Sequence, residues 1–137
     1  MSIVWVSGYP CSGKSFIGDY LMSEHGFHHV DGDWASQSKK PEDKELWANN
    51  VAAAAVFTSG QNPPEELWVP FFDILCQRAK QAVSEGKRAV ISYPLFNAKL
   101  RDWVRNRIEG QEFKIVMLDS DIQVLIDRFF ERTNATV

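Results

Sequence analysis

The sequence has few of the features that would place a protein outside the cytosol. Its 137 residues include two cysteines, Cys11 and Cys76, too few for a disulfide framework and typical of a reducing compartment. No apolar run approaches the about 18 residues that a membrane span needs, and the N-terminus has no secretory signal pattern. These absences predict a cytoplasmic protein that makes no use of a membrane.

An excess of charge of one sign is also missing. Fifteen Lys and Arg residues stand against 18 Asp and Glu, which gives a formal net charge of −3. We therefore expect no nucleic-acid partner, because nucleic-acid binding is usually accompanied by a basic surplus. The 45% hydrophobic and 24% charged residues are typical of a soluble globular domain, and the length fits one domain, here residues 1–137.

Short apolar runs alternate with segments of helical spacing. Strands are predicted at 3–7, 27–30, 89–92 and 113–118, and helices at 14–24, 45–59, 65–85, 97–107 and from about 120 onward. The polar segment 34–44 is predicted to be a loop. The first strand is continuously apolar, as is typical of a strand covered on both faces. The alternation predicts an α/β domain with a parallel sheet of about four strands and right-handed crossovers.

The strongest motif follows the first predicted strand. It reads Gly8-Tyr9-Pro10-Cys11-Ser12-Gly13-Lys14-Ser15 and matches G-x-x-x-x-G-K-[ST] in full. Backbone N–H groups of such a loop and of the following helix bind phosphate. Lys14 would bridge the β- and γ-phosphates of ATP, and the Ser15 hydroxyl would ligate Mg²⁺. A glycine turn before a surface lysine is the alternative, but the position between strand and helix favours ATP and Mg²⁺ as cofactors.

Two carboxylates follow the second predicted strand. Asp31 and Asp33 flank Gly32, at the strand end where open α/β sheets bind ligands. On an extended segment, residues two apart point the same way, so both would face the phosphate loop. One carboxylate could hold a water of the Mg²⁺ shell, and the other could orient a substrate hydroxyl for phosphoryl transfer. A solvated Asp-Gly turn is the alternative.

These motifs together resemble the small-molecule P-loop kinases, in particular the gluconate kinase and shikimate kinase group. The resemblance runs through most of the chain in order. Besides the phosphate loop it includes Asp31-Gly32-Asp33-Trp34, the acidic stretch into Trp and Pro at 65–70, Arg101-Asp102-Trp103-Val104-Arg105, and the Arg pair of Arg128-Phe129-Phe130-Glu131-Arg132. It implies a P-loop NTPase-type three-layer sandwich.

The resemblance also implies roles for individual residues. Asp31 would assist the metal through water, Asp33 would contact the acceptor hydroxyl, and Arg101 would bind the acceptor's carboxylate or the transferred phosphate. Arg128 and Arg132 would belong to the lid, residues 128–137, where they would bind ATP and, for Arg128, take part in catalysis. An Arg suits these roles because its planar fork pairs with two oxygens at once.

The chain departs from this family in three places. The segment after the third strand is Tyr93-Pro94-Leu95-Phe96-Asn97, so Asn97 stands where gluconate kinases have a lysine. Residues 34–64 are interpreted as an insertion on the substrate side. The family's fifth strand and last helix have no counterpart within the 137 residues. The first two departures leave the acceptor open between a sugar acid such as gluconate and a nucleotide or nucleoside, and the third keeps a non-catalytic nucleotide-binding module as an alternative.

Two further interpretations concern partners and side chains. A small-molecule acceptor is the expected partner, and a homodimer is left open. Trp34 could stack on the substrate or could serve in packing. His25, His28 and His29 lack the spacing of metal ligands and are interpreted as helix-end and strand residues.

Overall fold

A parallel β-sheet forms the centre of the protein. The computed structural model describes residues 2–8, 13–95 and 97–118, and their strands are β1 (Ser2–Gly8), β2 (His28–Asp31), β3 (Ala89–Ser92) and β4 (Glu112–Leu118). The strand order is β2-β3-β1-β4, and every neighbouring pair is parallel. The predicted sheet of about four strands is confirmed, with the first strand inside it.

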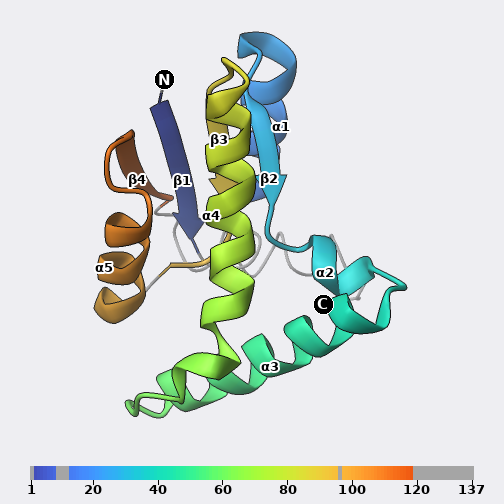
Figure 1. Ribbon diagram of the computed structural model, residues 1–137, viewed down its shortest axis with the longest axis vertical. Helices are drawn as coiled ribbons and strands as arrows, with labels where there is room; N and C mark the ends of the chain where they lie inside the picture. Colours follow the sequence, from blue (N-terminus) through green and yellow to red (C-terminus); the bar gives the residue numbers. More distant parts are fainter. Residues whose placement is uncertain (1, 9–12, 96, 119–137) are drawn as a thin grey trace, which may run out of the picture.

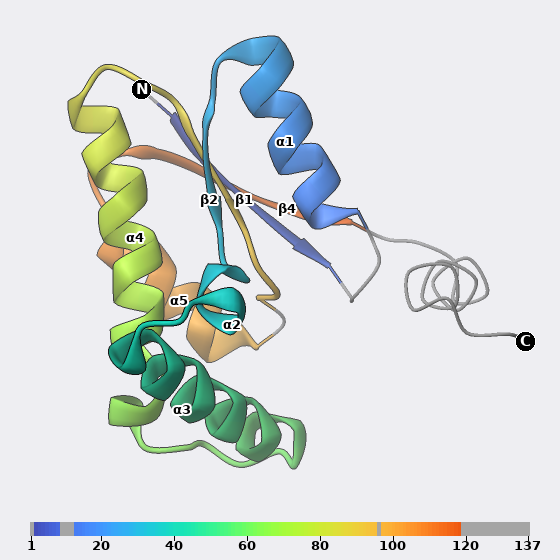
Figure 2. The ribbon, with the colours of Figure 1, turned by 90° about the vertical axis from the view of Figure 1, so that its right-hand side faces the viewer.

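Helices cover both faces of this sheet. They are α1 (Lys14–His25), α2 (Trp34–Gln37), α3 (Pro41–Thr58), α4 (Val69–Ser84) and α5 (Ala98–Arg107), with a 3₁₀ turn η1 (Glu65–Leu67) before α4. Figure 2 shows α1 on one face and α4 and α5 on the other. In Figure 1, α3 crosses beneath the carboxyl ends of the strands. The predicted three-layer α/β class is therefore confirmed, and α3 adds a wall at the edge where ligands bind in such sheets.

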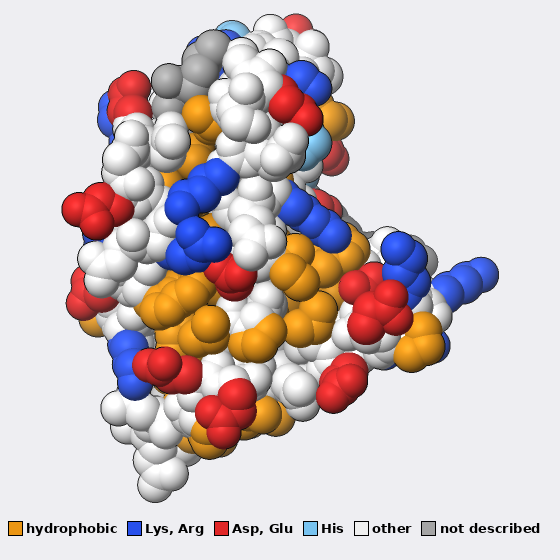
Figure 3. Space-filling view, in the orientation of Figure 1, with side chains coloured by type: hydrophobic (Ala, Val, Ile, Leu, Met, Phe, Trp, Pro, Cys, Tyr) orange, Lys and Arg blue, Asp and Glu red, His pale blue; other side chains and the backbone are white. Residues whose placement is uncertain are grey.

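The core is divided by the sheet into two parts. On the α4 and α5 side, buried Trp5 of β1 stacks on Phe72 of α4, with ring centroids 5.9 Å apart. A smaller cluster around Val6, Phe27 and Val90 lies on the α1 side. Hydrophobic side chains also reach the surface in the lower half of Figure 3, between α5, α4 and α2. β1 is apolar on both faces because both faces are covered, as its continuous apolar sequence indicates.

The segment 34–44 contains helices where a loop was predicted. Helix α2 begins directly after Asp33, and α3 begins at Pro41. Pro41 occupies the first turn of α3 and is followed by Glu42 and Asp43. A proline at this position sacrifices no helical hydrogen bond, and acidic side chains stabilise the helix N-terminus. The loop prediction was wrong because it treated this proline as a break rather than a start.

The predicted helix at 65–85 is divided in two. Pro70 lies in the first turn of α4, so the regular helix begins at Val69 and only the 3₁₀ turn η1 precedes it. The helix predicted from about residue 120 lies outside the described residues, as does the lid at 128–137. None of the described helices combines the length and the hydropathy that a bilayer-spanning segment needs.

Three hydrogen bonds join the segment after β3 to β1. The Trp5 indole N–H donates to the carbonyl oxygen of Tyr93 at 2.9 Å. The Tyr93 N–H donates to Val6 O at 3.2 Å, and the Leu95 N–H donates to the buried Ser7 hydroxyl at 2.7 Å. These bonds hold Tyr93 and Leu95 against the carboxyl end of β1, where the phosphate-loop motif begins.

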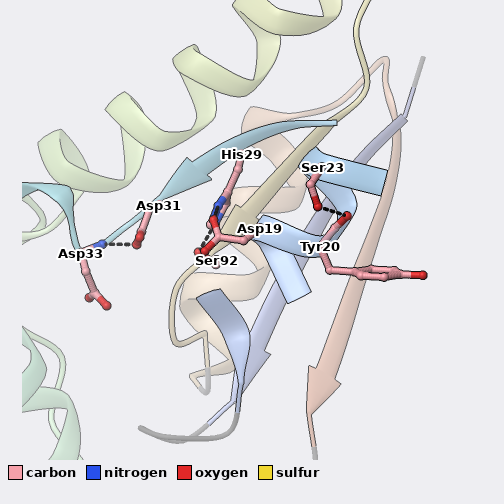
Figure 4. A network of polar contacts seen from close by, with 7 residues as sticks. All are labelled: Asp19, Tyr20, Ser23, His29, Asp31, Asp33 and Ser92. Carbon is pink, nitrogen blue, oxygen red and sulfur yellow. Dashed lines mark hydrogen bonds and ion pairs between the residues drawn. The ribbon is translucent and has the colours of Figure 1, made fainter. Parts of the chain in front are cut away.

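The buried side chain of one histidine connects α1 to the edge strand β2 and to its neighbour β3. His29 of β2 lies between Asp19 of α1 and Ser92 of β3 (Figure 4), with Nδ1 2.9 Å from Asp19 Oδ1 and Nε2 2.7 Å from Ser92 Oγ. The His29 side chain is 5% exposed and Asp19 67%, and Ser92 is 3% exposed. A series of hydrogen-bonded serine, histidine and aspartate side chains could activate the serine as a nucleophile only if the serine were accessible. Since Ser92 is buried, these hydrogen bonds have a structural role: they link α1, the helix after the phosphate-loop motif, to the sheet.

We expect His29→Ala to lower the free energy of unfolding by about 1–3 kcal/mol, because it leaves the buried Ser92 hydroxyl without its partner. His28→Ala is the matched control: His28 is exposed on the same strand, so its replacement should change stability by less than about 0.5 kcal/mol. Urea unfolding of both variants measures the difference. Equal effects of the two substitutions would contradict the role of His29.

Candidate functional site

The two ends of the phosphate-loop motif lie where a phosphate site requires them. Gly8 is the last residue of β1, and Lys14 is the first of α1. Gly13 precedes the helix with φ 98°, a left-handed conformation that a side chain disfavours. Ser15 follows in the first turn, and Lys14 and Ser15 are both half-buried. The strand and the helix thus flank the motif as predicted; Tyr9, Pro10, Cys11 and Ser12 lie outside the described residues.

Asp31 and Asp33 belong to a tight turn and not to an extended segment. β2 ends at Asp31, and the Asp33 N–H donates to Asp31 Oδ1 at 2.9 Å. Asp33 has helical backbone angles and precedes α2. Figure 4 shows the Asp31 carboxylate directed at the Asp33 N–H. The expectation of an extended segment was wrong, because the Asp31 side chain accepts the Asp33 N–H and the backbone forms a turn.

Tyr93 holds this turn in place. Its ring lies so close to Gly32 that a Cβ there would be 2.3 Å from Tyr93 Cδ1, which explains the glycine between the two aspartates. Asn50 of α3 is 4% exposed, and its Nδ2 donates to the Tyr93 hydroxyl at 2.6 Å. Burial, with a smaller contribution from the nearby Asp33 carboxylate, raises the pKa of Tyr93 to about 12, although the hydrogen bond from Asn50 acts in the opposite direction. Tyr93 therefore stays a neutral phenol beside Asp33.

A cavity of about 380 Å³ opens next to Tyr93. Its walls come from α3, α4, α5 and the segment between β3 and α5: Asn50, Ala53, Ala54, Phe57, Thr58, Phe72, Tyr93, Pro94, Asn97 and Leu100. The volume lies within the range of about 300–1,000 Å³ of small-molecule sites. The cavity has one wall from the 34–64 segment, which was predicted to lie on the substrate side.

Sequence reasoning missed Asn50 and the role of Tyr93. Asn50, Ala53 and Phe57 are three and four residues apart, so they share one face of α3. A single amide in an otherwise apolar face of an alanine-rich helix is a signal that could have found Asn50, since a buried polar group needs a partner. The partner itself is 43 residues away in the chain, and no local pattern indicates it.

Trp34 and Arg101 contact protein groups near the site. Trp34 stacks on Phe71 with centroids 5.4 Å apart, and the Arg78 guanidinium lies 4.2 Å from its ring centroid, which favours the packing alternative for Trp34. Arg101, in the first turn of α5, donates from Nη1 to Leu95 O at 3.3 Å. Arg128 and Arg132 lie outside the described residues.

The donor groups that the structure describes fit a nucleotide with Mg²⁺. Among these residues, no group of three or more His, Cys, Asp or Glu side chains could hold a metal ion by itself. Mg²⁺ commonly takes one or two protein oxygens and completes its shell with phosphates and water. The hydroxyl of Ser15 and the carboxylate of Asp31 are donors of that kind, and the N-terminus of the 12-residue helix α1 suits phosphate.

Taken together, the sheet order, the motif between β1 and α1 and the acidic turn after β2 define an α/β protein with the P-loop kinase fold. Comparison with solved structures supports this class. A gluconokinase from Sinorhizobium meliloti 1021 has a TM-score of 0.65 and 21% identity, with 99% of this chain and 67% of that chain covered. A sugar kinase from Janibacter sp. HTCC2649 has a TM-score of 0.65 and 19% identity, with 96% and 68% covered.

A third similar structure comes from a different context. A chain of the Pnkp1/Rnl/Hen1 RNA repair complex has a TM-score of 0.65 and 12% identity, with 98% of this chain and 38% of that chain covered. No family model and no curated protein matches the sequence. At these identities the likeness establishes the fold, and the chain spans about two thirds of the length of the two sugar kinases.

We expect the phenol of Tyr93 to titrate near pH 12, against the ordinary value of 10.0. The folded state then keeps a proton that the unfolded state releases, so this group's stabilising contribution is complete below pH 10 and is lost as the pH rises toward 12. Ultraviolet difference titration should show this late phase, and Tyr93→Phe should remove it.

Burial also raises the pKa of the Cys76 thiol to about 12. This thiol is present in both the wild type and Tyr93→Phe, so its contribution to the pH dependence cancels when the two proteins are compared. Tyr20→Phe is the control and should leave the late phase intact. A late phase that survives Tyr93→Phe would contradict the assignment.

Proposed function

We propose that the protein is a P-loop kinase that transfers the γ-phosphoryl group of ATP to a hydroxyl of a small molecule. The observation that carries the proposal is the position of Gly8 at the end of β1 and of Gly13 and Lys14 at the start of α1, at the same carboxyl edge of the sheet as Asp33. That edge is where open α/β sheets bind ligands. The likeness in fold to two sugar kinases supports it.

In this function the phosphate loop and the N-terminus of α1 bind the ATP phosphates, and the Lys14 ammonium neutralises negative charge on them. The Asp33 carboxylate accepts a hydrogen bond from the acceptor hydroxyl and receives its proton. The acceptor oxygen forms the new bond to the γ-phosphorus as the bond to the β–γ bridging oxygen breaks, which yields a phosphorylated acceptor and ADP. Mg²⁺, held with Ser15 and through water by Asp31, supplies further charge neutralisation when bound.

The arginines complete the proposal. Arg101 is assigned to the acceptor or the transferred phosphate, Arg128 to the phosphoryl group and ATP, and Arg132 to ATP, each from the family resemblance. Trp34 remains a candidate contact with substrate by the same resemblance. Gluconate is the acceptor that the resemblance implies, and a nucleoside or nucleotide is the alternative.

We expect Lys14→Ala to reduce phosphoryl transfer by about 100-fold or more, because a charge that stabilises the transition state is lost. Lys87→Ala is the matched control, since Lys87 is exposed between α4 and β3, and it should keep full activity. ADP formation in the presence of Mg²⁺ and a panel of acceptors measures both variants. Full turnover in Lys14→Ala would contradict the kinase assignment, and ATP binding without turnover of any acceptor would favour a non-catalytic nucleotide-binding module.

We expect Asp33→Asn to lower turnover by about 10²–10⁴-fold, the usual contribution of a positioned proton acceptor, with little change in ATP affinity. The substitution keeps the size of the side chain and removes its charge. Glu24→Gln, which removes an exposed charge from the last turn of α1, is the control. Steady-state kinetics and calorimetry with ADP separate the two effects; an unchanged turnover would move the proton-accepting role away from Asp33.

A further inference from the structure

The cavity beside Tyr93 is placed to hold the acceptor. Tyr93 lines it and is close enough to Asp33 for that carboxylate to raise its pKa. The three hydrogen bonds to β1 hold the same segment at the strand end where the phosphate loop begins. Tyr93 therefore borders both the cavity and, through the contact of its ring with Gly32, the turn that carries the proposed proton acceptor.

The walls are mainly apolar, and their polar groups are neutral. Six of the lining residues are hydrophobic: Ala53, Ala54, Phe57, Phe72, Pro94 and Leu100. The others are Asn50, Thr58, Tyr93 and Asn97. Two hydrogen bonds use part of the bonding capacity of these polar residues. Asn50 Nδ2 donates to the Tyr93 hydroxyl, and Asn97 Oδ1 accepts from the Lys99 N–H at 2.8 Å. The hydroxyl proton of Tyr93, Oδ1 of Asn50 and Nδ2 of Asn97 remain for a bound molecule among the described contacts.

The electrostatics of this cavity disfavour an anionic acceptor. No described residue in its lining carries a charge, and the charged group known to act on the lining is Asp33, which is negative. A carboxylate or phosphate moved from water into an apolar site requires a cationic partner to offset its desolvation. Asn97 stands where gluconate kinases have a lysine. Its side chain caps the N-terminus of α5 by accepting the Lys99 N–H.

Resting on the proposed function, we propose that the cavity between α3 and the segment joining β3 to α5 is the acceptor site, and that it selects an uncharged alcohol with an apolar or aromatic body. The apolar walls bury the body of the molecule, and the neutral amide and phenol groups bind its polar atoms. Its reactive hydroxyl faces Asp33. A sugar acid such as gluconate is a poor occupant because its carboxylate has no partner in the described lining. Arg101 is not part of that lining and, in this proposal, serves the transferred phosphate rather than the acceptor.

Matched pairs of probes that differ by one charged group test the selection. We suggest 1,4-benzenedimethanol with 4-(hydroxymethyl)benzoate, uridine with UMP, and glucitol with gluconate. Each is titrated into the ADP- and Mg²⁺-saturated protein by calorimetry, so the readout does not require turnover. We expect the uncharged member of at least one of the first two pairs to bind at least tenfold more tightly than its charged partner.

Two neighbouring alanines provide matched variants. Ala54 and Ala55 are both exposed on α3, but only Ala54 lines the cavity. Ala54→Arg places a long charged side chain at the cavity and should weaken binding of the uncharged probe at least tenfold. Ala55→Arg adds the same charge to the same helix outside the cavity and should leave binding unchanged. Urea unfolding of both variants should match the wild type.

The outcomes separate this proposal from the proposed function. Uncharged probes that bind, and lose affinity with Ala54→Arg alone, support the acceptor site whether or not they are phosphorylated. Tighter binding of the charged members, equal effects of the two variants, or binding of no probe would overturn it. Phosphorylation of gluconate with insensitivity to Ala54→Arg would uphold the kinase and overturn the cavity as its acceptor site.

Discussion

The contacts of one side chain, Tyr93, decide the geometry of the candidate site. Its backbone is held to β1 by bonds to Trp5 and Val6, and its ring packs on Phe71 and Phe72 of α4. The same ring occupies the space beside Gly32, and its hydroxyl accepts from Asn50 of α3. The acidic turn, the central strand and two helices thus meet at one half-buried phenol. A neutral, rigid ring suits this place because a charge or a flexible chain would weaken the packing on every side.

This arrangement separates two kinds of binding at the same edge of the sheet. The start of α1 presents N–H groups, Lys14 and Ser15, which suit a polyanion. The cavity behind Tyr93 presents apolar walls and uncharged polar atoms, which suit a neutral molecule. Asp33 lies at the boundary, where a proton would leave the acceptor. In the proposed function, this difference in surroundings would keep a charged donor and an uncharged acceptor in separate sites.

Much of the fold could be predicted from local patterns. The continuous apolar run of β1 and the glycines and lysine that follow it indicate a strand, a loop and a helix, and the structure has the strand and the helix at the predicted positions. The stretch at 34–44 was mispredicted because Pro41 is ambiguous: a proline both interrupts regular structure and begins helices, and only the packing of α3 beyond the strand ends decides which. The acidic turn was placed correctly along the chain, but its shape depends on a bond from the Asp31 side chain to the Asp33 N–H.

The sequence by itself determined the alternation of strands and helices, the parallel sheet and the residues at the start of α1, because each depends on neighbours within a few positions. Tertiary structure alone decided the cavity, the Asn50–Tyr93 bond and the link from Asp19 through His29 to Ser92. Asn50 and Tyr93 are 43 residues apart in the sequence, and His29 and Ser92 are 63 residues apart. A periodic pattern shows that such a polar residue will be buried but not which partner it meets, since that depends on how the helices cross the sheet.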